Sequence, residues 1–229
     1  MKTLSLVVPV YNAPGLARAL VARIPELRET ARSQGFELVE TILVDDGSSC
    51  ALSCGPDGVQ DAGVPLRILR NERNRGKGYA VRRGALEARG DWVLMSDVDL
   101  STPFTEFARL AVRADDAWMV CGSRHGRPGM PWRRRILSRV FQSLVRLAGI
   151  RGVHDTQCGF KLFRMGEMRR IFEIQRIERF SFDVELVRLV QLAGGSVAEV
   201  PVTWRGGARS SLRVLRDAPR MLYDLFRIR

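Results

Sequence analysis

The sequence predicts one α/β domain built on a doubly wound, mostly parallel sheet with helices on both faces. Short apolar segments of strand length alternate with longer segments of helical periodicity, and this alternation implies right-handed βαβ crossovers. The chain has 229 residues, of which 45% are hydrophobic, so it can bury a single large core.

The first half of the chain contains most of the regular pattern. Residues 4–10 are a near-continuous apolar run, which is typical of a strand buried on both faces of a parallel sheet. Pro14 begins a helical pattern that continues to about residue 34. The later elements are expected as a strand at 37–44, a loop at 47–65, a strand at 66–69, a helix at 78–88, a strand at 92–95, a helix at 103–114 and a strand at 118–121.

The second half is less regular and favours helices. Amphipathic helices are expected at 136–147 and across 215–226, and a further helix at 183–192. The C-terminal pattern places apolar side chains on one face and arginines on another. Such helices either pack on the core or lie on a membrane surface, and the sequence leaves both alternatives open.

Charge is distributed unevenly along the chain. The formal net charge is +12, but residues 1–116 carry −1 and residues 117–229 carry +13. A field of one sign attracts an anionic partner such as a lipid headgroup, a phosphorylated substrate or a nucleic acid; a solvated basic face is the alternative. No stretch approaches the roughly 20 apolar residues of a transmembrane helix, and the start resembles a strand more than a signal peptide. A cytoplasmic protein is therefore expected.

Charged residues follow three of the predicted strands. Asp45 and Asp46 come directly after the second strand, Lys77 stands between two glycines after the third, and Asp97 and Asp99 end the fourth. Ligands of an open parallel sheet bind beyond the carboxyl ends of its strands. A carboxylate there can bind a nucleoside, and two carboxylates one residue apart can hold a divalent cation that neutralises a diphosphate. A glycine-flanked cation before a helix suits phosphate.

Each cluster alone is a weak signal, but their order and spacing are specific. The chain resembles family 2 glycosyltransferases, which have the Rossmann-like GT-A fold, in four motifs at residues 7–12, 44–49, 74–78 and 96–99. Residues 155–163 and 179–186 are similar to the dolichyl-phosphate β-glucosyltransferase branch, whose bacterial relatives are polyprenyl-phosphate glycosyltransferases.

This resemblance implies a role for particular side chains. Asp97 and Asp99 would hold Mg²⁺ or Mn²⁺, while Asp155 and Asp183 would orient the sugar or the acceptor; Asp183 could equally cap the helix that it precedes. The residues implied in binding the nucleotide sugar are Pro9, Tyr11, Asp45, Asp46, Lys77, Asp97, Gln157 and Lys161. Those implied in binding the acceptor phosphate are Arg124, Arg133 and Arg134.

The expected reaction is an inverting transfer of a hexose, preferably glucose from UDP-glucose, to a polyprenyl or dolichyl phosphate at the cytoplasmic membrane surface. Residues 1–116 would bind the donor and residues 117–229 the acceptor, within one domain. Members of this branch carry membrane helices at one end, and none is recognisable here, so peripheral membrane contact is expected.

Three alternatives stay open at this stage. The same fold can use GDP-mannose or a non-lipid acceptor. An inactive basic protein that binds membranes or nucleic acid is a different class, but both DxD carboxylates remain, which argues against it and against a nucleic-acid partner. A nucleotidyltransferase is disfavoured because no glycine-rich phosphate loop follows the first strand.

Overall fold

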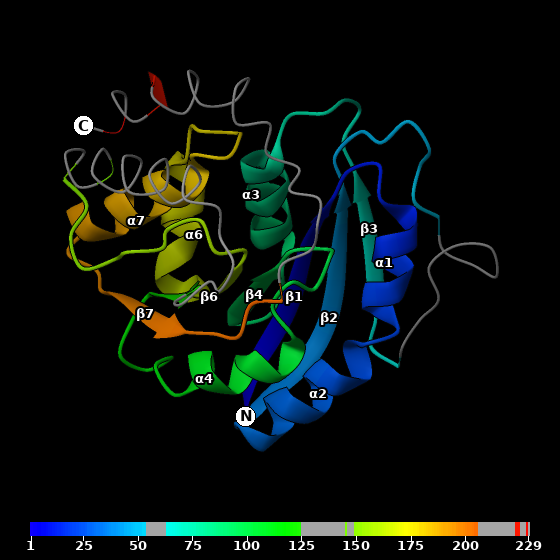
Figure 1. Ribbon diagram of the computed structural model, residues 1–229, viewed down its shortest axis with the longest axis horizontal. Coiled ribbons are helices and arrows are strands. Elements are labelled where there is room, and N and C mark those ends of the chain that lie inside the picture. The colour runs from blue at the N-terminus through cyan, green and yellow to red at the C-terminus, as the bar shows by residue number, and fades with distance from the viewer. Residues whose placement is uncertain (54–62, 125–144, 146–148, 206–222, 225–227, 229) are drawn as a thin grey trace.

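The computed structural model describes residues 1–53, 63–124, 145, 149–205, 223–224 and 228 (Figure 1). Within these residues, seven strands form one sheet in the order β3-β2-β1-β4-β6-β5-β7. The strands are β1 (Lys2–Val10), β2 (Phe36–Asp45), β3 (Leu66–Arg70), β4 (Trp92–Ser96), β5 (Met119–Ser123), β6 (Phe160–Arg164) and β7 (Val197–Pro201). Only β6 runs antiparallel to its neighbours, so the expected mostly parallel sheet is confirmed.

Helices cover both faces of this sheet, as expected. One face packs against α1, α2 and α4, and the other against α3, α6 and α7 (Figure 1). The bounds are α1 (Pro14–Val21), α2 (Ile24–Ser33), α3 (Lys77–Glu87), α4 (Phe107–Ala111), α6 (Met165–Ile174) and α7 (Phe182–Leu192), with a 3₁₀ turn, η1 (Phe104–Glu106), before α4.

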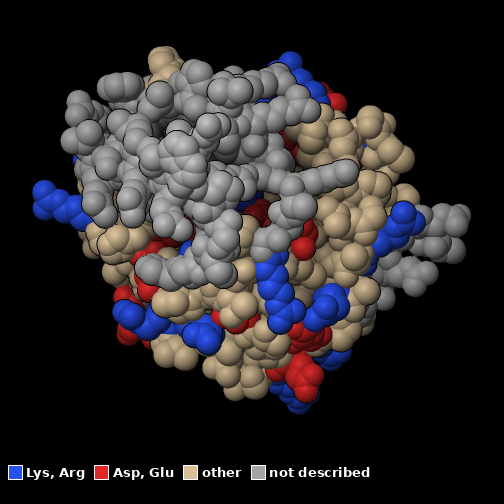
Figure 2. All heavy atoms as spheres, viewed as in Figure 1, with Lys and Arg blue, Asp and Glu red and all other residues tan. Residues whose placement is uncertain are grey.

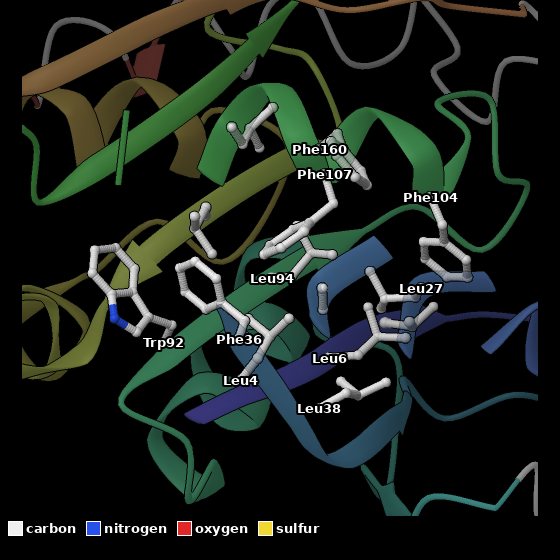
Figure 3. Packing of buried hydrophobic residues seen from close by; sticks show 14 of the residues in the cluster. Leu4, Leu6, Leu27, Phe36, Leu38, Trp92, Leu94, Phe104, Phe107 and Phe160 are labelled. Carbon is white, nitrogen blue, oxygen red and sulfur yellow. The ribbon is translucent and has the colours of Figure 1, made fainter. Parts of the chain in front are cut away.

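Aromatic side chains anchor the face that α2 and α4 cover. Phe36 at the start of β2 meets Trp92 edge-to-face with ring centroids 5.8 Å apart, and meets Phe107 of α4 at 5.2 Å (Figure 3). Edge-to-face pairs add to the free energy that burial of the rings contributes. Leu4 and Leu6 of β1 belong to the same core, so the strand that leads to the site is fixed from this side.

Two expected helices are shorter or divided. The pattern at 14–34 forms α1 and α2 with a break between them, because Pro25 stands in the first turn of α2 and a proline cannot continue a helix from the preceding turn. The helix expected at 103–114 starts as η1 and ends at Ala111. The acidic pair Asp115 and Asp116 follows, and negative charge is unfavourable at a helix C-terminus.

The second half contains elements that the sequence pattern did not predict. These are β6, α6 and β7, whereas α7 matches the helix expected at 183–192 to within one residue. The expected helices at 136–147 and 215–226 fall almost entirely outside the described residues. None of the helices within the described ranges has the length and apolar character to cross a membrane.

The strand order predicts a ligand-binding crevice at the end of β1. Because β1 has β2 on one side and β4 on the other, the chain winds in opposite directions from this strand. Open α/β sheets bind their ligands at such a switch point, beyond the carboxyl ends of the strands. The segments that begin there are residues 11–12, 45–49 and 97–100.

Candidate active site

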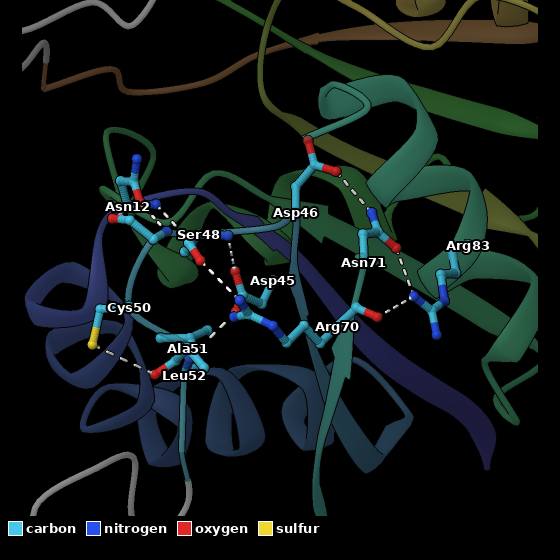
Figure 4. A network of polar contacts seen from close by, with 11 residues as sticks. Asn12, Asp45, Asp46, Ser48, Cys50, Ala51, Leu52, Arg70, Asn71 and Arg83 are labelled. Atoms are coloured by element: carbon cyan, nitrogen blue, oxygen red, sulfur yellow. Dashed lines mark hydrogen bonds and ion pairs between the residues drawn. The ribbon is translucent and has the colours of Figure 1, made fainter. Parts of the chain in front are cut away.

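Asp45, at the end of β2, holds the loop that follows it. Its carboxylate accepts hydrogen bonds from the amides of Ser48 at 3.0 Å and Leu52 at 3.2 Å, and lies 2.5 Å from the Arg70 guanidinium (Figure 4). Burial alone would raise the pKa of Asp45, but hydrogen bonds from the Ser48 side chain and from these two amides, with the Arg70 charge, lower it below the ordinary value. Asp45 is therefore an ionised, fully buried anchor.

Asp46 joins the end of β2 to the segment that leads into α3. Its Oδ1 accepts hydrogen bonds from the Asn71 amide group at 2.7 Å and the Arg75 backbone at 3.0 Å, and its Oδ2 from the Gly76 backbone at 2.7 Å. Gly76 has a φ of 117°, and a Cβ there would lie 2.6 Å from the carbonyl oxygen of Glu178. The glycine thus allows the turn that sets the position of Lys77.

Lys77 is the first residue of α3 and points to the end of β4. Its Nζ lies 2.6 Å from Oδ1 of Asp97, and its side chain is 19% exposed. A cation and the first carboxylate of the DxD motif therefore meet at the sheet edge.

The backbone around Asp97 approaches the start of β6 closely. The Asp97 amide donates a hydrogen bond to the carbonyl of Gly159 at 3.0 Å. A Cβ at residue 159 would lie 1.8 Å from Oδ2 of Asp97, so any larger residue there would have to displace this carboxylate. Asp99 is exposed, and its Oδ1 accepts a hydrogen bond from the Ser101 amide at 2.9 Å.

The two DxD carboxylates fit a hard divalent cation that shares its ligands with a substrate. One oxygen of Asp97 contacts Lys77, and the Asp99 carboxylate is exposed. The described part of the chain contains no group of three or more His, Cys, Asp or Glu side chains that could hold a metal. Mg²⁺ typically takes one or two carboxylates and completes its octahedron with water and substrate phosphates, so Asp97 and Asp99 could supply its protein ligands.

Asp155 and Arg124 form a two-pronged ion pair. The Arg124 Nε and Nη2 each lie 2.7 Å from one Asp155 oxygen, and the Arg124 backbone amide donates to Oδ2 at 3.0 Å. The Arg124 guanidinium also lies 5.9 Å from the Trp204 ring centroid. The amide of Asp155 donates to Glu199 of β7 at 2.8 Å, so Asp155 is held from both sides.

Lys161 and Asp183 form a buried ion pair, with exposed side-chain fractions of 0% and 3%. Their charged atoms are 2.6 Å apart, and Lys161 also donates a hydrogen bond to the Cys158 carbonyl. Burial raises the pKa of the Asp183 carboxyl, an effect that Lys161 and Lys77 oppose. No side-chain hydrogen bond caps α7, although Asp183 stands in its first turn.

The remaining predicted residues lie at the end of β1, before β6 or outside the described ranges. Pro9 is half-buried in β1, and Tyr11 is exposed just beyond the carboxyl end of that strand. Gln157 donates through its side chain to the Phe180 carbonyl at 3.2 Å, which links the start of β6 to the start of α7. Arg133 and Arg134 lie outside the described residues, as does most of the basic segment 117–154.

Figure 2 shows atoms of acidic and basic side chains side by side on the surface that faces the viewer, where grey atoms do not cover it. The predicted excess of positive charge in residues 117–229 depends on residues outside the described ranges.

Sequence reasoning missed several supporting side chains. Asn71, directly after β3, bonds to Asp46 and accepts from Arg83 at 2.6 Å; its place at a strand end was a usable signal. Asn12, after β1, accepts from the Ser49 amide at 2.8 Å and has a φ of 49°. Glu199 had no local signal, because it reaches Asp155 from β7.

Known proteins are similar in sequence to this chain over most or nearly all of its length. Residues 5–172 match the family described as Glycosyl transferase family 2. The dolichyl-phosphate beta-glucosyltransferase of Dictyostelium discoideum is 36% identical over 240 residues, which cover 99% of this chain and 73% of that protein. The Homo sapiens enzyme of the same name is 32% identical over 89% of this chain and 67% of its own length.

A solved structure shares the architecture at low sequence identity. Glucosyl-3-phosphoglycerate synthase from Mycobacterium tuberculosis, in complex with Mn²⁺, UDP and glucosyl-3-phosphoglycerate, matches with a TM-score of 0.64 and 16% identity. The match covers 99% of this chain and 78% of that one. At this identity the likeness shows the fold, which is the GT-A arrangement. The family match over residues 5–172 and the 36% identity to the Dictyostelium discoideum enzyme confirm the resemblance of the motifs: the chain belongs to glycosyltransferase family 2.

Proposed function

We propose that the chain is an inverting glucosyltransferase that moves glucose from UDP-glucose to a polyprenyl or dolichyl phosphate. The observation that carries this proposal is the contact between Lys77 and Asp97 at the switch point of the sheet. A diphosphate bound there would meet both a positive charge and a carboxylate that can hold a divalent cation. The names of the relatives at 36% and 32% identity support the sugar and the acceptor. The UDP bound in the structurally similar synthase supports the donor base.

The donor would lie across the ends of β1, β2 and β4. Asp45 and Asp46 order the two loops that follow β2 and precede α3, while Pro9 and Tyr11, at the end of β1, would line the donor site. Lys77 would neutralise a diphosphate oxygen.

Asp97 and Asp99 are the side chains that would hold Mg²⁺ or Mn²⁺, as the donor set permits. When bound, the cation would neutralise the charge that develops on the leaving diphosphate. Lys161 and Gln157 would support the site indirectly, by fixing the segment before β6. Lys161 donates to the Cys158 carbonyl, and the Gln157 side chain donates to the Phe180 carbonyl.

Acceptor binding is assigned to the second half of the chain. Arg133 and Arg134 would bind the lipid phosphate through their guanidinium forks. Arg124 would instead hold Asp155 in one orientation, since two of its nitrogens already contact that carboxylate. Asp155 would then orient the acceptor or a sugar hydroxyl, with Asp183 and Lys161 fixing the floor of the site.

The reaction is a single displacement at the anomeric carbon. An acceptor phosphate oxygen forms the new bond to C1, the bond from C1 to the diphosphate oxygen breaks, and UDP leaves with the electron pair. The configuration at C1 is inverted. A phosphate monoester is already largely ionised near neutral pH, so the step needs orientation more than a strong base.

The basic second half would also bring the enzyme to its lipid substrate. Residues 117–229 carry a net charge of +13, which favours contact with anionic headgroups on the cytoplasmic face. In this arrangement the single domain has a donor half, 1–116, and an acceptor half, 117–229.

A donor screen tests the proposal. The purified chain is incubated with Mn²⁺ or Mg²⁺, a panel of UDP- and GDP-sugars and a short polyprenyl phosphate. Turnover of UDP-glucose to a lipid-linked glucose is expected, with at least a hundredfold loss in Asp99→Asn. Asp115→Asn, an exposed aspartate at the opposite edge of the sheet, is the matched control and should retain activity.

The other outcomes select among the alternatives. Turnover of GDP-mannose, or donor hydrolysis without a lipid product, would keep the transferase and replace the substrate. Absence of turnover with every donor, together with salt-dependent binding to duplex DNA or anionic vesicles, would favour an inactive binding protein.

A further inference from the structure

Lys77 and Asp97 are held in contact by the fold on both sides. The position of Lys77 depends on Gly76, whose amide donates to Oδ2 of Asp46 at 2.7 Å. Asp97 is held by its own amide, which donates to the carbonyl of Gly159 at 3.0 Å. The backbones of both partners in this 2.6 Å ion pair are therefore positioned by the fold.

The pair also excludes other cations from the same carboxylate oxygen. An ammonium 2.6 Å from Oδ1 of Asp97 would stand within a few ångströms of a divalent ion on that oxygen, and like charges at that distance repel strongly. Lys77 is only 19% exposed, so water screens this repulsion poorly. A nucleoside diphosphate would offer Lys77 a second anionic partner in the same crevice.

We propose that Lys77 is the resident counter-ion of Asp97 in the donor-free enzyme and that it transfers to the diphosphate when the donor enters. The transfer releases a carboxylate oxygen for the divalent cation, so the donor and the cation bind with positive cooperativity. By linkage, the cation must raise donor affinity by the same factor. This inference rests on the proposed function only in taking a nucleoside diphosphate as the ligand.

Metal titrations test the exchange without any turnover. Mn²⁺ is titrated into the full chain by calorimetry, first without nucleotide and then with saturating UDP, for wild type, Lys77→Gln and Lys77→Arg. Without nucleotide, Lys77→Gln should bind Mn²⁺ roughly fivefold more tightly, because the competing ammonium is gone. The gain in Mn²⁺ affinity that UDP confers should shrink in this variant, and Lys77→Arg should behave like wild type.

Lys2→Gln is the matched control for the loss of one positive charge. Lys2 forms an ion pair of 2.5 Å with Asp115 at the amino end of β1, and its removal should leave Mn²⁺ binding unchanged. Equal or weaker Mn²⁺ binding by Lys77→Gln, or the same tightening in Lys2→Gln, would overturn the inference.

The result is separable from the fate of the proposed function. Tighter Mn²⁺ binding by Lys77→Gln supports the counter-ion role even if no sugar is transferred in the donor screen. Turnover of UDP-glucose with unchanged Mn²⁺ affinity in Lys77→Gln overturns the counter-ion role alone.

Discussion

Nζ of Lys161 lies 2.6 Å from Oδ1 of Asp183, and this pair joins the sheet to the first turn of α7 in a region without solvent contact. Removal of one partner leaves a buried charge uncompensated, which typically costs about 3–5 kcal/mol. We expect Lys161→Met to lower the free energy of unfolding by that amount, measured by urea denaturation followed by circular dichroism.

The double variant Lys161→Met/Asp183→Leu should recover much of this loss, since it buries no charge. Lys2→Met, which breaks an exposed ion pair, should cost less than about 1 kcal/mol. Equal losses for Lys161→Met and Lys2→Met would contradict the importance of the buried pair.

A methyl group at residue 159 would collide with the DxD motif. The added Cβ would lie 1.8 Å from Oδ2 of Asp97, so Gly159→Ala must displace that carboxylate. We expect sugar transfer to fall by roughly a hundredfold, because small displacements of positioned groups cost that much. Initial rates of donor turnover measure the effect, and circular dichroism verifies that the variant is folded.

Gly166→Ala is the matched control for this substitution. Gly166 lies in α6, and its added Cβ would meet no atom within 4 Å. Activity should stay at the wild-type level while the helix gains about 0.5–1 kcal/mol. Comparable activity losses in both variants would exclude a specific clash with Asp97.

The sequence predicted the strands of the first half close to their observed bounds. β1 and β4 are nearly continuous apolar runs, and both of them, like β2, were expected within two residues of where they begin and end. By contrast, β6 contains a fully buried lysine, which interrupts the apolar pattern. Its partner Asp183 is 22 positions further along the chain, and only the tertiary structure shows that the charge is compensated.

For the site, the sequence predicted the location but not the contacts within it. The rule that ligands bind beyond strand ends located Asp46 and Asp97 at one edge of the sheet. It did not show that Asp46 bonds to the Gly76 backbone, or that Asp97 already has a cationic partner in Lys77. Those contacts depend on the turn before α3, and hydrophobic periodicity does not predict the conformation of a turn.

The two-pronged contact between Arg124 and Asp155 should couple the two residues energetically. Both side chains are 16% exposed, and a lysine at residue 124 cannot reproduce two parallel hydrogen bonds. In a double-mutant cycle with Arg124→Lys and Asp155→Asn, we expect a coupling energy above about 1.5 kcal/mol in thermal unfolding. The exposed pair Arg113 and Asp116, treated identically, should give less than about 1 kcal/mol. Similar coupling in both cycles would show that Arg124 contributes no special restraint.

Glu40 should make the stability of the fold depend on pH in the acidic range. Burial would raise the pKa of its carboxyl, but hydrogen bonds from the Arg89 amide at 2.6 Å and the Ser5 hydroxyl at 2.8 Å, with the Arg67 charge, lower that pKa below its ordinary 4.5. The unfolded chain then binds a proton more readily than the folded one.

The stabilisation from Glu40 is consequently complete above pH 4.5 and is lost as the pH falls through the lowered pKa of the folded state. Urea denaturation midpoints measured from pH 7 to pH 3 should show that Glu40→Gln is less stable than wild type at pH 7. Its remaining loss on acidification should be smaller than that of wild type. Glu37→Gln, at an exposed position of the same strand, should follow the wild-type curve. Parallel curves for wild type and Glu40→Gln would show that the carboxylate is not linked to folding, because linkage requires a difference in proton binding between the two states.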